Sequence, residues 1–305
     1  MKIGIIGGTG LYAMDSLEGA ERIEMETPFG KPSDTFVTGT LGGCEAVFLA
    51  RHGQGHHILP SEINHRANVF AMKKLGVERL IAVSAVGSLR EELAPGDLVL
   101  VDQYVDRTKR GADHTFFGNG VVAHVGFGDP ACSALRNDIF TEANAVLSGK
   151  PKTSLASRPP RVHPGGTYVN MEGPAFSTRA ESFLYKSWGM DVVGMTNLAE
   201  AKLAREAEMC FCALAFVTDY DCWHDVHEDV SVQMIVEVLR RNAETAKEIL
   251  SRVIPLCGGQ TELSCDCRNA LAGAIATDES AMPAETKTAL APLIGRHLSQ
   301  DLGQR

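Results

Sequence analysis

The 305-residue sequence lacks the features that assign chains to several large classes of protein. No segment approaches the roughly 18 apolar residues of a membrane-spanning helix. The first residues, MKIGIIGG, have neither the apolar length nor the small-residue cleavage site of a signal peptide. The formal net charge is -9, and no stripe of Lys and Arg with interleaved aromatic residues is present. We therefore expect a cytoplasmic protein that binds neither membranes nor nucleic acid.

The chain also lacks C-x-x-C pairs, although it contains 8 cysteines. That spacing is typical of zinc ribbons and of thioredoxin-like redox sites, so neither is indicated. Most of the cysteines are expected to be small buried apolar side chains. Cys265 and Cys267 are an exception, because a C-x-C in a polar segment is either a redox-sensitive pair or has no role. The sequence predicts no metal site.

What the sequence does contain is an alternation of β-rich apolar runs with helical patterns. The runs are KIGII, EAVFLA, RLIAVSA, DLVLVD, TYVNM, DVVGM and MCFCALAFV. Helical periodicity is clearest over Ser61–Leu75, with Ser61 as the expected N-cap, and over Ser231–Val253. This alternation predicts one α/β domain over residues 1–305, with a central mixed β-sheet flanked by helices on both faces.

The C-terminal segment, from about residue 257 to 305, is less regular than the rest of the chain. A helical pattern returns over Ala284–Leu298 and is expected to break near Pro292. We expect this segment to pack on a partner or to cover a site.

Small and polar residues follow the first two of these strands. GGTG, Gly7–Gly10, is either a plain tight turn or a loop whose N–H groups and Thr9 hydroxyl hold an anion. A dinucleotide-binding reading is weak, because no crossover helix fits before Gly19. In ARHGQGHH, Arg51 can hold an oxyanion through two N–H bonds and His52 can add a donor. The alternative is that Arg51 pairs with a structural acid.

Three further strand ends carry groups suited to a nucleoside. VSAVGS (Val83–Ser88) and GMT (Gly194–Thr196) offer hydroxyls and free N–H groups for phosphate or ribose oxygens. In MEGPAFSTRAES, Glu172 can bridge ribose hydroxyls and Phe176 can stack on a flat ring. A helix start capped by Ser177 is an equally good explanation of that motif. Ligands of open α/β sheets bind at the carboxyl ends of strands, so these ends are expected to converge.

Two carboxylates, Asp219 and Asp221, follow the most apolar run. Residues two apart in extended backbone point to the same face of a sheet. If both are desolvated and close together, ionising both is costly and the apparent pKa of one rises. A carboxylic acid that keeps its proton at neutral pH can act as a general acid.

Taken in order, these motifs resemble one known family. GGTGLY, TPFGKPSD, ARHG, GSLREE, PGDLVLVDQYVDRT, EGPAFSTRAES, SWGMDVVGMT and FVTDYDCW are similar to segments of the 5'-methylthioadenosine phosphorylases, in the trimeric purine nucleoside phosphorylase superfamily. The resemblance covers roughly residues 1–255. It implies a nucleoside phosphorylase-like fold and a homotrimer.

The resemblance also implies roles for individual residues. The phosphate site would consist of Thr9, Arg51, His52, Ser84, Ala85 and Thr196. The nucleoside site would consist of Met195 under the ribose, Phe176, Ser177, Asp219 and Asp221 around the purine, His124 from a neighbouring subunit, and Leu293 from a mobile C-terminal helix that closes the methylthio pocket.

The activity that the resemblance implies is phosphorolysis of 5'-methylthioadenosine to adenine and 5-methylthioribose 1-phosphate, a pentosyl transfer in methionine and purine salvage. Phosphate is a co-substrate, and no cofactor is expected. Asp219 is predicted to donate a proton to purine N7, and Asp221 to accept from the 6-amino group. The alternatives are a phosphorylase for 5'-methylthioinosine or ordinary purine nucleosides, and a non-catalytic nucleoside-binding protein. An NAD-dependent dehydrogenase is a distant third.

Overall fold

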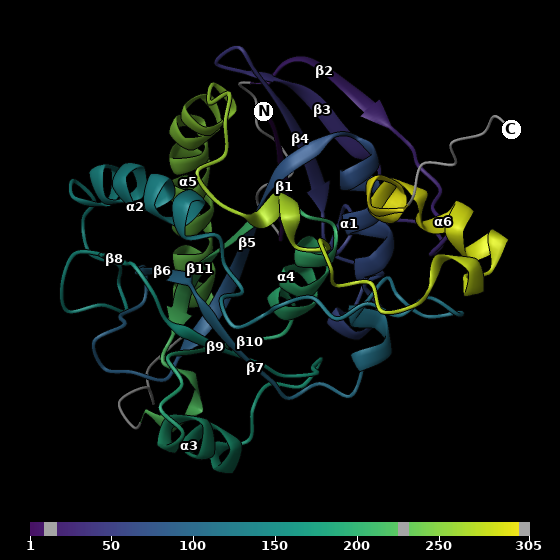
Figure 1. Cartoon of the computed structure of the whole chain (residues 1–305). Coiled ribbons are helices and arrows are strands. Elements are labelled where there is room, and N and C mark those ends of the chain that lie inside the picture. The colour runs from purple at the N-terminus through teal and green to yellow at the C-terminus, as the bar shows by residue number, and fades with distance from the viewer. Residues whose placement is uncertain (9–16, 225–231, 299–305) are drawn as a thin grey trace, which may run out of the picture.

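A computed structural model describes residues 1–8, 17–224 and 232–298 (Figure 1). The strands are β1 Lys2–Gly7, β2 Glu18–Ile23, β3 Phe36–Leu41, β4 Cys44–Ala50, β5 Val77–Ser88, β6 Leu98–Val101, β7 Gln103–Asp106, β8 Val162–His163, β9 Thr167–Asn170, β10 Val192–Gly194 and β11 Cys210–Asp219. The α-helices are α1 His65–Lys74, α2 Ser133–Leu147, α3 Arg179–Ser187, α4 Asn197–Glu206, α5 Val232–Gly258 and α6 Ala284–Ile294. Short 3-10 turns are η1 Pro60–Glu62, η2 Gly111–His114, η3 Asp221–Trp223, η4 Cys267–Asn269, η5 Glu279–Ala281 and η6 Gly295–His297.

All seven predicted apolar runs form strands, namely β1, β4, β5, β6, β9, β10 and β11. The run before Asp219 is buried on both faces, as expected, because every residue of Cys210–Val217 is buried. Four strands were not predicted: β2, β3, β7 and β8. β2 is exposed along nearly its whole length and β8 has two residues, so neither carries a strong apolar signal.

The described strands form one mixed sheet, with β5 at its centre. One edge of β5 pairs in parallel with β11 over Arg79–Gly87. The other edge pairs in parallel with β1 only as far as Val83, and then with the antiparallel β10 from Gly87. The sheet therefore divides at the carboxyl end of β5. On that edge, Ser84–Val86 lie between the part of β5 that pairs with β1 and the part that pairs with β10.

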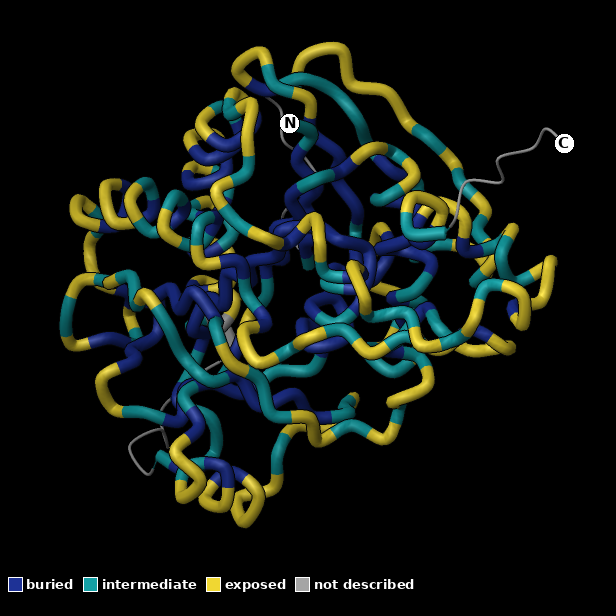
Figure 2. The backbone as a smooth tube through the Cα atoms, viewed as in Figure 1, coloured by how far each residue is buried: buried dark blue, intermediate teal, exposed yellow. Residues whose placement is uncertain are grey.

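Helices cover both faces of the sheet, as the sequence predicts. Side chains of β11 alternate between two core clusters: Phe211 and Ala213 face one, and Cys212 and Leu214 the other. Residues of α1, α4 and α6 belong to the first cluster, and residues of α2 and α5 to the second. Figure 1 shows α2 and α5 on one side of the sheet and α1, α4 and α6 on the other. Figure 2 shows the buried strands between helices whose outer turns are exposed.

Helix boundaries differ from the predicted ones for local reasons. α1 begins at His65 rather than near Ser61, because the Asn64 side chain caps it by accepting from the Ala67 N–H. α5 continues beyond Val253 to Gly258. α6 is not broken at Pro292, which lies in its last turn, and it ends at Ile294.

The C-terminal segment packs within its own chain. Leu271, Met282, Leu290 and Leu293 belong to the main core cluster beside residues of α1 and α4. Among the described residues, no helix is long and apolar enough to cross a membrane.

Candidate active site

The division of the sheet brings four predicted strand ends to one place. The carboxyl ends of β1, β4 and β5 lie side by side, because β1 pairs in parallel with both of the others. β10 approaches from the opposite direction, since it is antiparallel to β5. Helix α4 follows β10 directly, with Thr196 as its N-cap. A helix N-terminus beside an unpaired strand edge favours an anion, although the Leu198 N–H of α4 is already used by Asn170 Oδ1.

Arg51 lies at the end of β4 and is almost completely buried, at 1% exposure. Its guanidinium makes a bidentate pair with Glu200 of α4, with N–O distances of 2.5 and 3.0 Å. It also donates to the carbonyls of Val83 and Ile6. The pairing with a structural acid, left open by the sequence, is therefore present. Four of its five N–H donors are used by described residues, so Arg51 can offer an anion one N–H in this arrangement.

His52 differs from the donor that the sequence predicted. Its Nδ1 lies 2.9 Å from the carbonyl oxygen of Ile58, which can only accept, so Nδ1 carries the proton. Burial lowers the pKa of His52 to about 4, with a smaller contribution from the Arg51 charge. The neutral ring has its lone pair on Nε2. His52 is thus an acceptor at Nε2, suited to a phosphate hydroxyl rather than to a bare phosphate oxygen.

The remaining predicted phosphate residues line the divided edge of the sheet. Ser84 donates to Oδ1 of Asn197 at 2.6 Å, and Ala85 is exposed. The Thr196 side chain makes no capping hydrogen bond to α4, although its residue is the N-cap. Its hydroxyl is therefore not committed to the helix. Thr9, in the GGTG loop, lies outside the described residues.

The two aspartates lie close together, but not for the reason that the sequence suggested. Asp219 ends β11, whereas Asp221 begins η3 and has a left-handed φ of 44°. The chain turns back after the strand, so the Asp221 N–H donates to Asp219 Oδ1 at 2.8 Å. Gly87 lies against both, because a Cβ there would come within 3.2 Å of the Asp221 Cβ. Its lack of a side chain keeps this end of β5 open.

The pKa of Asp221 is raised. Burial raises it and the Asp219 charge adds to this, while hydrogen bonds from Ser182 and Ser177 act in the opposite direction. The Ser182 hydroxyl donates to Asp221 Oδ2 at 2.6 Å. The pKa of Asp221 thus rises, as was expected of one carboxyl of the pair, whereas the sequence led us to predict Asp219 as the proton donor.

Asp219 also has a hydroxyl neighbour, Thr218. The Thr218 Oγ1 lies 2.7 Å from Asp219 Oδ2 and 3.2 Å from the Val86 carbonyl oxygen. Because this hydroxyl carries one proton, it can donate to only one of them. If it donates to Val86, the bond to Asp219 requires the proton to be on the carboxyl. The local geometry therefore accommodates a protonated Asp219.

The groups predicted to bind phosphate and the two aspartates lie at opposite ends of a short stretch of β5. Ser84 is at one end and Gly87, against the aspartates, at the other, which is roughly 10 Å along a strand. A small cleft beside Met195 and Thr196 is lined in part by Glu172. Glu172 also accepts from the Lys109 N–H. The spacing suits a ligand with an anion at one end and a polar ring at the other.

The remaining predicted nucleoside residues differ in exposure. Phe176 is 84% exposed, and His124 is exposed, with its backbone N–H bonded to Ala274. Leu293 is buried in the core at 2% exposure, so the expected mobile helix is packed in this structure. Ser177 lies near Asp221, but Thr178 and not Ser177 caps α3, through a capping box with Glu181.

Sequence reasoning missed the residues that support this site. Glu200 holds Arg51, Asn197 links Ser84 to Glu200, and Ser182 holds Asp221. A signal was available for Glu200 and Asn197, since both lie in the first turn of a helix that follows a strand. Ser182 lies four residues after its helix cap and has no comparable signal.

Residues 2–255 match the model of the phosphorylase superfamily. The chain belongs to this superfamily. An S-methyl-5'-thioadenosine phosphorylase from Geobacter sulfurreducens is 52% identical over 296 residues, covering 97% of this chain and 99% of the relative. Another, from Thermosynechococcus vestitus, is 51% identical and covers 97% and 99% of the two chains.

Solved structures agree with this assignment of the fold. A methylthioadenosine phosphorylase sourced from an Antarctic soil metagenomic library has a TM-score of 0.87 at 44% identity, covering 95% of this chain and 98% of that one. A methylthioadenosine phosphorylase from Schistosoma mansoni in complex with adenine has a TM-score of 0.80 at 38% identity, covering 92% and 99%. The nucleoside phosphorylase-like fold predicted from the sequence is confirmed.

Proposed function

We propose that this protein is a 5'-methylthioadenosine phosphorylase, which splits its substrate with phosphate into adenine and 5-methylthioribose 1-phosphate in methionine and purine salvage. The observation that carries the proposal is the arrangement around β5, with anion-binding groups near Ser84 and an aspartate pair at Gly87. Relatives with about half of their residues identical over nearly the full length are S-methyl-5'-thioadenosine phosphorylases. Both the site and the relatives point to the same reaction.

Phosphorolysis breaks the bond between the sugar and the base while a phosphate oxygen attacks the sugar carbon. The sugar becomes cation-like, so the phosphate must be held beside it without being neutralised. Buried Arg51 is already paired with Glu200, and this pair adds no net charge. Phosphate is then bound by the α4 N-terminus, the Thr196 hydroxyl and the remaining Arg51 N–H, beside Ser84, whose hydroxyl proton is donated to Asn197. Phosphate bound in this way keeps most of its negative charge, which stabilises the cation-like sugar.

At the other end, the leaving purine needs a proton or a strong hydrogen bond at N7. We assign this role to Asp219, because the Thr218–Val86 arrangement accommodates its protonated form. Asp221, held by Ser182, accepts from the 6-amino group. The raised pKa of Asp221 favours one competing assignment, in which the two aspartates exchange these roles.

The same pair bears on the choice of base. An ionised carboxylate facing position 6 accepts from an amino group and repels a 6-oxo group. This favours adenine-type nucleosides over 5'-methylthioinosine and inosine. A related phosphorylase for 6-oxo nucleosides would need a donor at this position instead.

We also propose that the active form is a homotrimer in which a neighbouring subunit completes the nucleoside site. Ser182 of α3 contacts Asp221, and the same helix carries the exposed side chains Phe183 and Leu184. Trp188, at its C-cap, and Phe176, shortly before its N-cap, are also exposed. Clusters of this kind are typical of protein interfaces. His124 is remote from the aspartates along the chain and is exposed, as a residue donated to a neighbour would be. Mass measurement in solution tests the stoichiometry.

Product identification tests the proposed reaction. The protein is incubated with 5'-methylthioadenosine and phosphate, and the sugar product is identified by mass spectrometry. Phosphorolysis gives 5-methylthioribose 1-phosphate in equal amount to adenine, whereas hydrolysis gives 5-methylthioribose. Binding of the nucleoside without any product would instead favour the non-catalytic alternative.

A further inference from the structure

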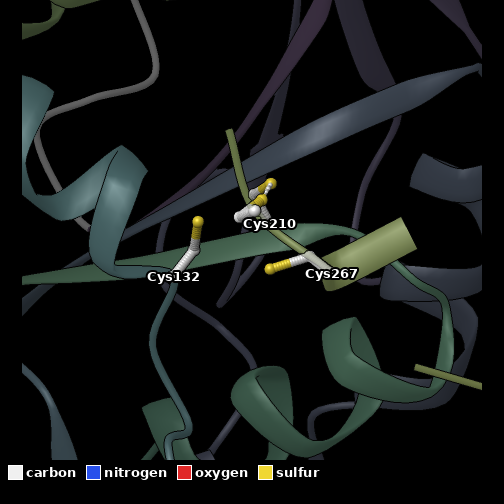
Figure 3. Close-up of side chains that lie close together, drawn as sticks. Cys132, Cys210 and Cys267 are labelled. Carbon is white, nitrogen blue, oxygen red and sulfur yellow. Dashed lines mark hydrogen bonds between the residues drawn. The ribbon is translucent and has the colours of Figure 1, made fainter. Parts of the chain in front are cut away.

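Four cysteines that are far apart in the sequence converge on one point, away from the site described above. They are Cys132, Cys210, Cys265 and Cys267, and their sulfur atoms all lie within 4.8 Å of one another. They come from three separate stretches: the N-cap of α2, the first residue of β11, and the segment that follows α5. Figure 3 shows the Cys132 and Cys267 side chains directed toward the space beside Cys210.

The spacing of the sulfurs suits a shared ion better than disulfide bonds. The Cys210 and Cys265 sulfurs are 3.4 Å apart, whereas a disulfide bond holds its sulfurs at about 2.05 Å. All four cysteines are free thiols. In a tetrahedral site with Zn–S distances near 2.3 Å, the sulfurs lie about 3.8 Å apart. The observed separations, from 3.4 Å to less than 4.8 Å, surround that value, so small movements would complete the tetrahedron.

The surroundings favour thiolates and a soft metal. Cys132 caps α2, and its sulfur accepts from the Leu135 N–H at 3.5 Å, so the positive end of this helix faces it. Cys132, Cys210 and Cys267 are buried, and Cys265 is partly exposed, which leaves one side for entry of an ion. The group contains sulfur ligands alone. Four thiolates select zinc over the oxygen-seeking magnesium and calcium ions.

The cluster lies at the amino end of β11, and the aspartates lie at its carboxyl end. Ten residues of strand separate them by roughly 30 Å. Four protein ligands would also leave no open position for a substrate, which is typical of structural rather than catalytic zinc. The cluster joins the C-terminal segment, which carries Cys265 and Cys267, to the strand β11 and to the helix α2.

We propose that Cys132, Cys210, Cys265 and Cys267 form a tetrahedral zinc site that fastens the C-terminal segment to the sheet. On binding, one Zn²⁺ replaces the four thiol protons, which are released to solvent, and no oxidation occurs. The site departs from the sequence-based expectation of no metal. Glu208, which precedes β11, also holds the C-terminal segment, since it accepts from the Leu271 N–H and pairs with Arg296 at 2.7 Å.

Elemental analysis of the intact purified chain tests the proposal. We expect about one zinc per chain in the parent protein, and a loss of roughly tenfold or more in the C265S/C267S double variant. The matched control is C44A, whose thiol lies outside the cluster and contacts the Pro255 carbonyl; it should keep its zinc. Removing zinc with a chelator should lower the melting temperature and expose the chain to proteolysis after Gly258, and added zinc should reverse both changes.

A metal-exchange experiment keeps the test independent of the variants' folding. Cobalt added to the zinc-free parent protein should give the intense thiolate-to-cobalt absorption and the visible bands of a tetrahedral sulfur site. The proposal is overturned if the parent protein holds no zinc and binds no cobalt. It is also overturned if the intact mass is lower by two hydrogens for each pair of cysteines, which would show disulfides, or if iron or copper is the bound metal.

Discussion

The peptide N–H of Asp221 donates a 2.8 Å hydrogen bond to the side chain of Asp219. This bond holds the Asp219 carboxyl group against the Asp221 backbone and occupies one oxygen of Asp219. The other oxygen faces Thr218, and Asp221 has its own hydroxyl partner in Ser182. Each aspartate is thus held by different groups, which allows one to act as an acid and the other as an acceptor.

Replacing Asp219 with Asn should lower kcat on 5'-methylthioadenosine by on the order of a hundredfold, because the proton for N7 is lost. Steady-state kinetics with the exposed D129N variant as control would measure this effect. A D219N enzyme with near-normal turnover would remove Asp219 from the mechanism.

Substrate analogues separate the two assignments of the aspartates. If Asp219 serves N7, a 7-deaza nucleoside should react as slowly with the parent enzyme as with D219N, since the analogue has no N7 to protonate. D221N should instead reduce the preference for 6-amino over 6-oxo nucleosides. The reversed pattern would show that the two residues exchange roles.

Removing the Ser182 hydroxyl should raise the pKa of Asp221 further. The hydroxyl stabilises the ionised form, and a hydrogen bond to a charged group is worth roughly 1.5–3 kcal/mol, or about one to two pKa units. In S182A, the limb of the kcat/KM pH profile that reports this group should therefore move to higher pH, and S182T should move it back. The exposed S187A variant, on the same helix, is the control. Equal profiles for S182A and S187A would contradict the positioning role of Ser182.

Breaking the buried Arg51–Glu200 pair should be costly. Arg51 and Glu200 are 1% and 0% exposed, so E200Q leaves a buried charge without its partner, at a cost of about 3–5 kcal/mol. Phosphate should stabilise E200Q more than the parent protein, because it supplies the missing negative charge. Thermal unfolding with and without phosphate measures both effects.

The control for this variant is E142Q, which breaks the more exposed pair with Arg252 and should cost less than about 1 kcal/mol. Equal destabilisation by E200Q and E142Q would show that the buried pair contributes no more than a surface pair.

Glu206 predicts a specific dependence of stability on pH. Burial raises the pKa of Glu206 from 4.5 to about 7. Between these values the folded chain holds a proton that the unfolded chain has released. The stability contributed by this group is therefore complete below about pH 4.5 and is lost as the pH rises toward 7, by at most about 1.4 kcal/mol per pH unit.

Urea unfolding from pH 4.5 to 7 compares the parent protein with E206Q, which has no such proton. The free energy of unfolding should fall less steeply with pH in E206Q, while E244Q, at an exposed position, should follow the parent. Parallel slopes for all three proteins would show that Glu206 titrates normally.

Much of the fold could be predicted from the sequence, because its central strands contain long apolar runs and its helices alternate with them. β11 and β5 are examples, since their side chains contact core on both faces. β2 was not predicted because it is exposed and has no apolar pattern. It forms a strand by pairing with β3, and its own sequence does not show that pairing. The start of α1 depended on a competition between two capping residues, Ser61 and Asn64, that sequence alone did not decide.

The site was predicted less completely than the fold. Strand ends were visible as polar residues after apolar runs, which identified Arg51 and the two aspartates. Their partners were not, because Glu200 is 149 residues from Arg51 and Ser182 is 39 residues from Asp221. The four-cysteine cluster was missed for the same reason, since Cys132 and Cys210 are remote in sequence from each other and from the C-x-C of Cys265 and Cys267.

The most direct test of the proposed function is the initial rate of base release from 5'-methylthioadenosine, with and without phosphate, beside adenosine, inosine and 5'-methylthioinosine. The proposed mechanism predicts release that requires phosphate and is fastest for 5'-methylthioadenosine. Release that does not depend on phosphate, or faster cleavage of the 6-oxo nucleosides, would contradict it.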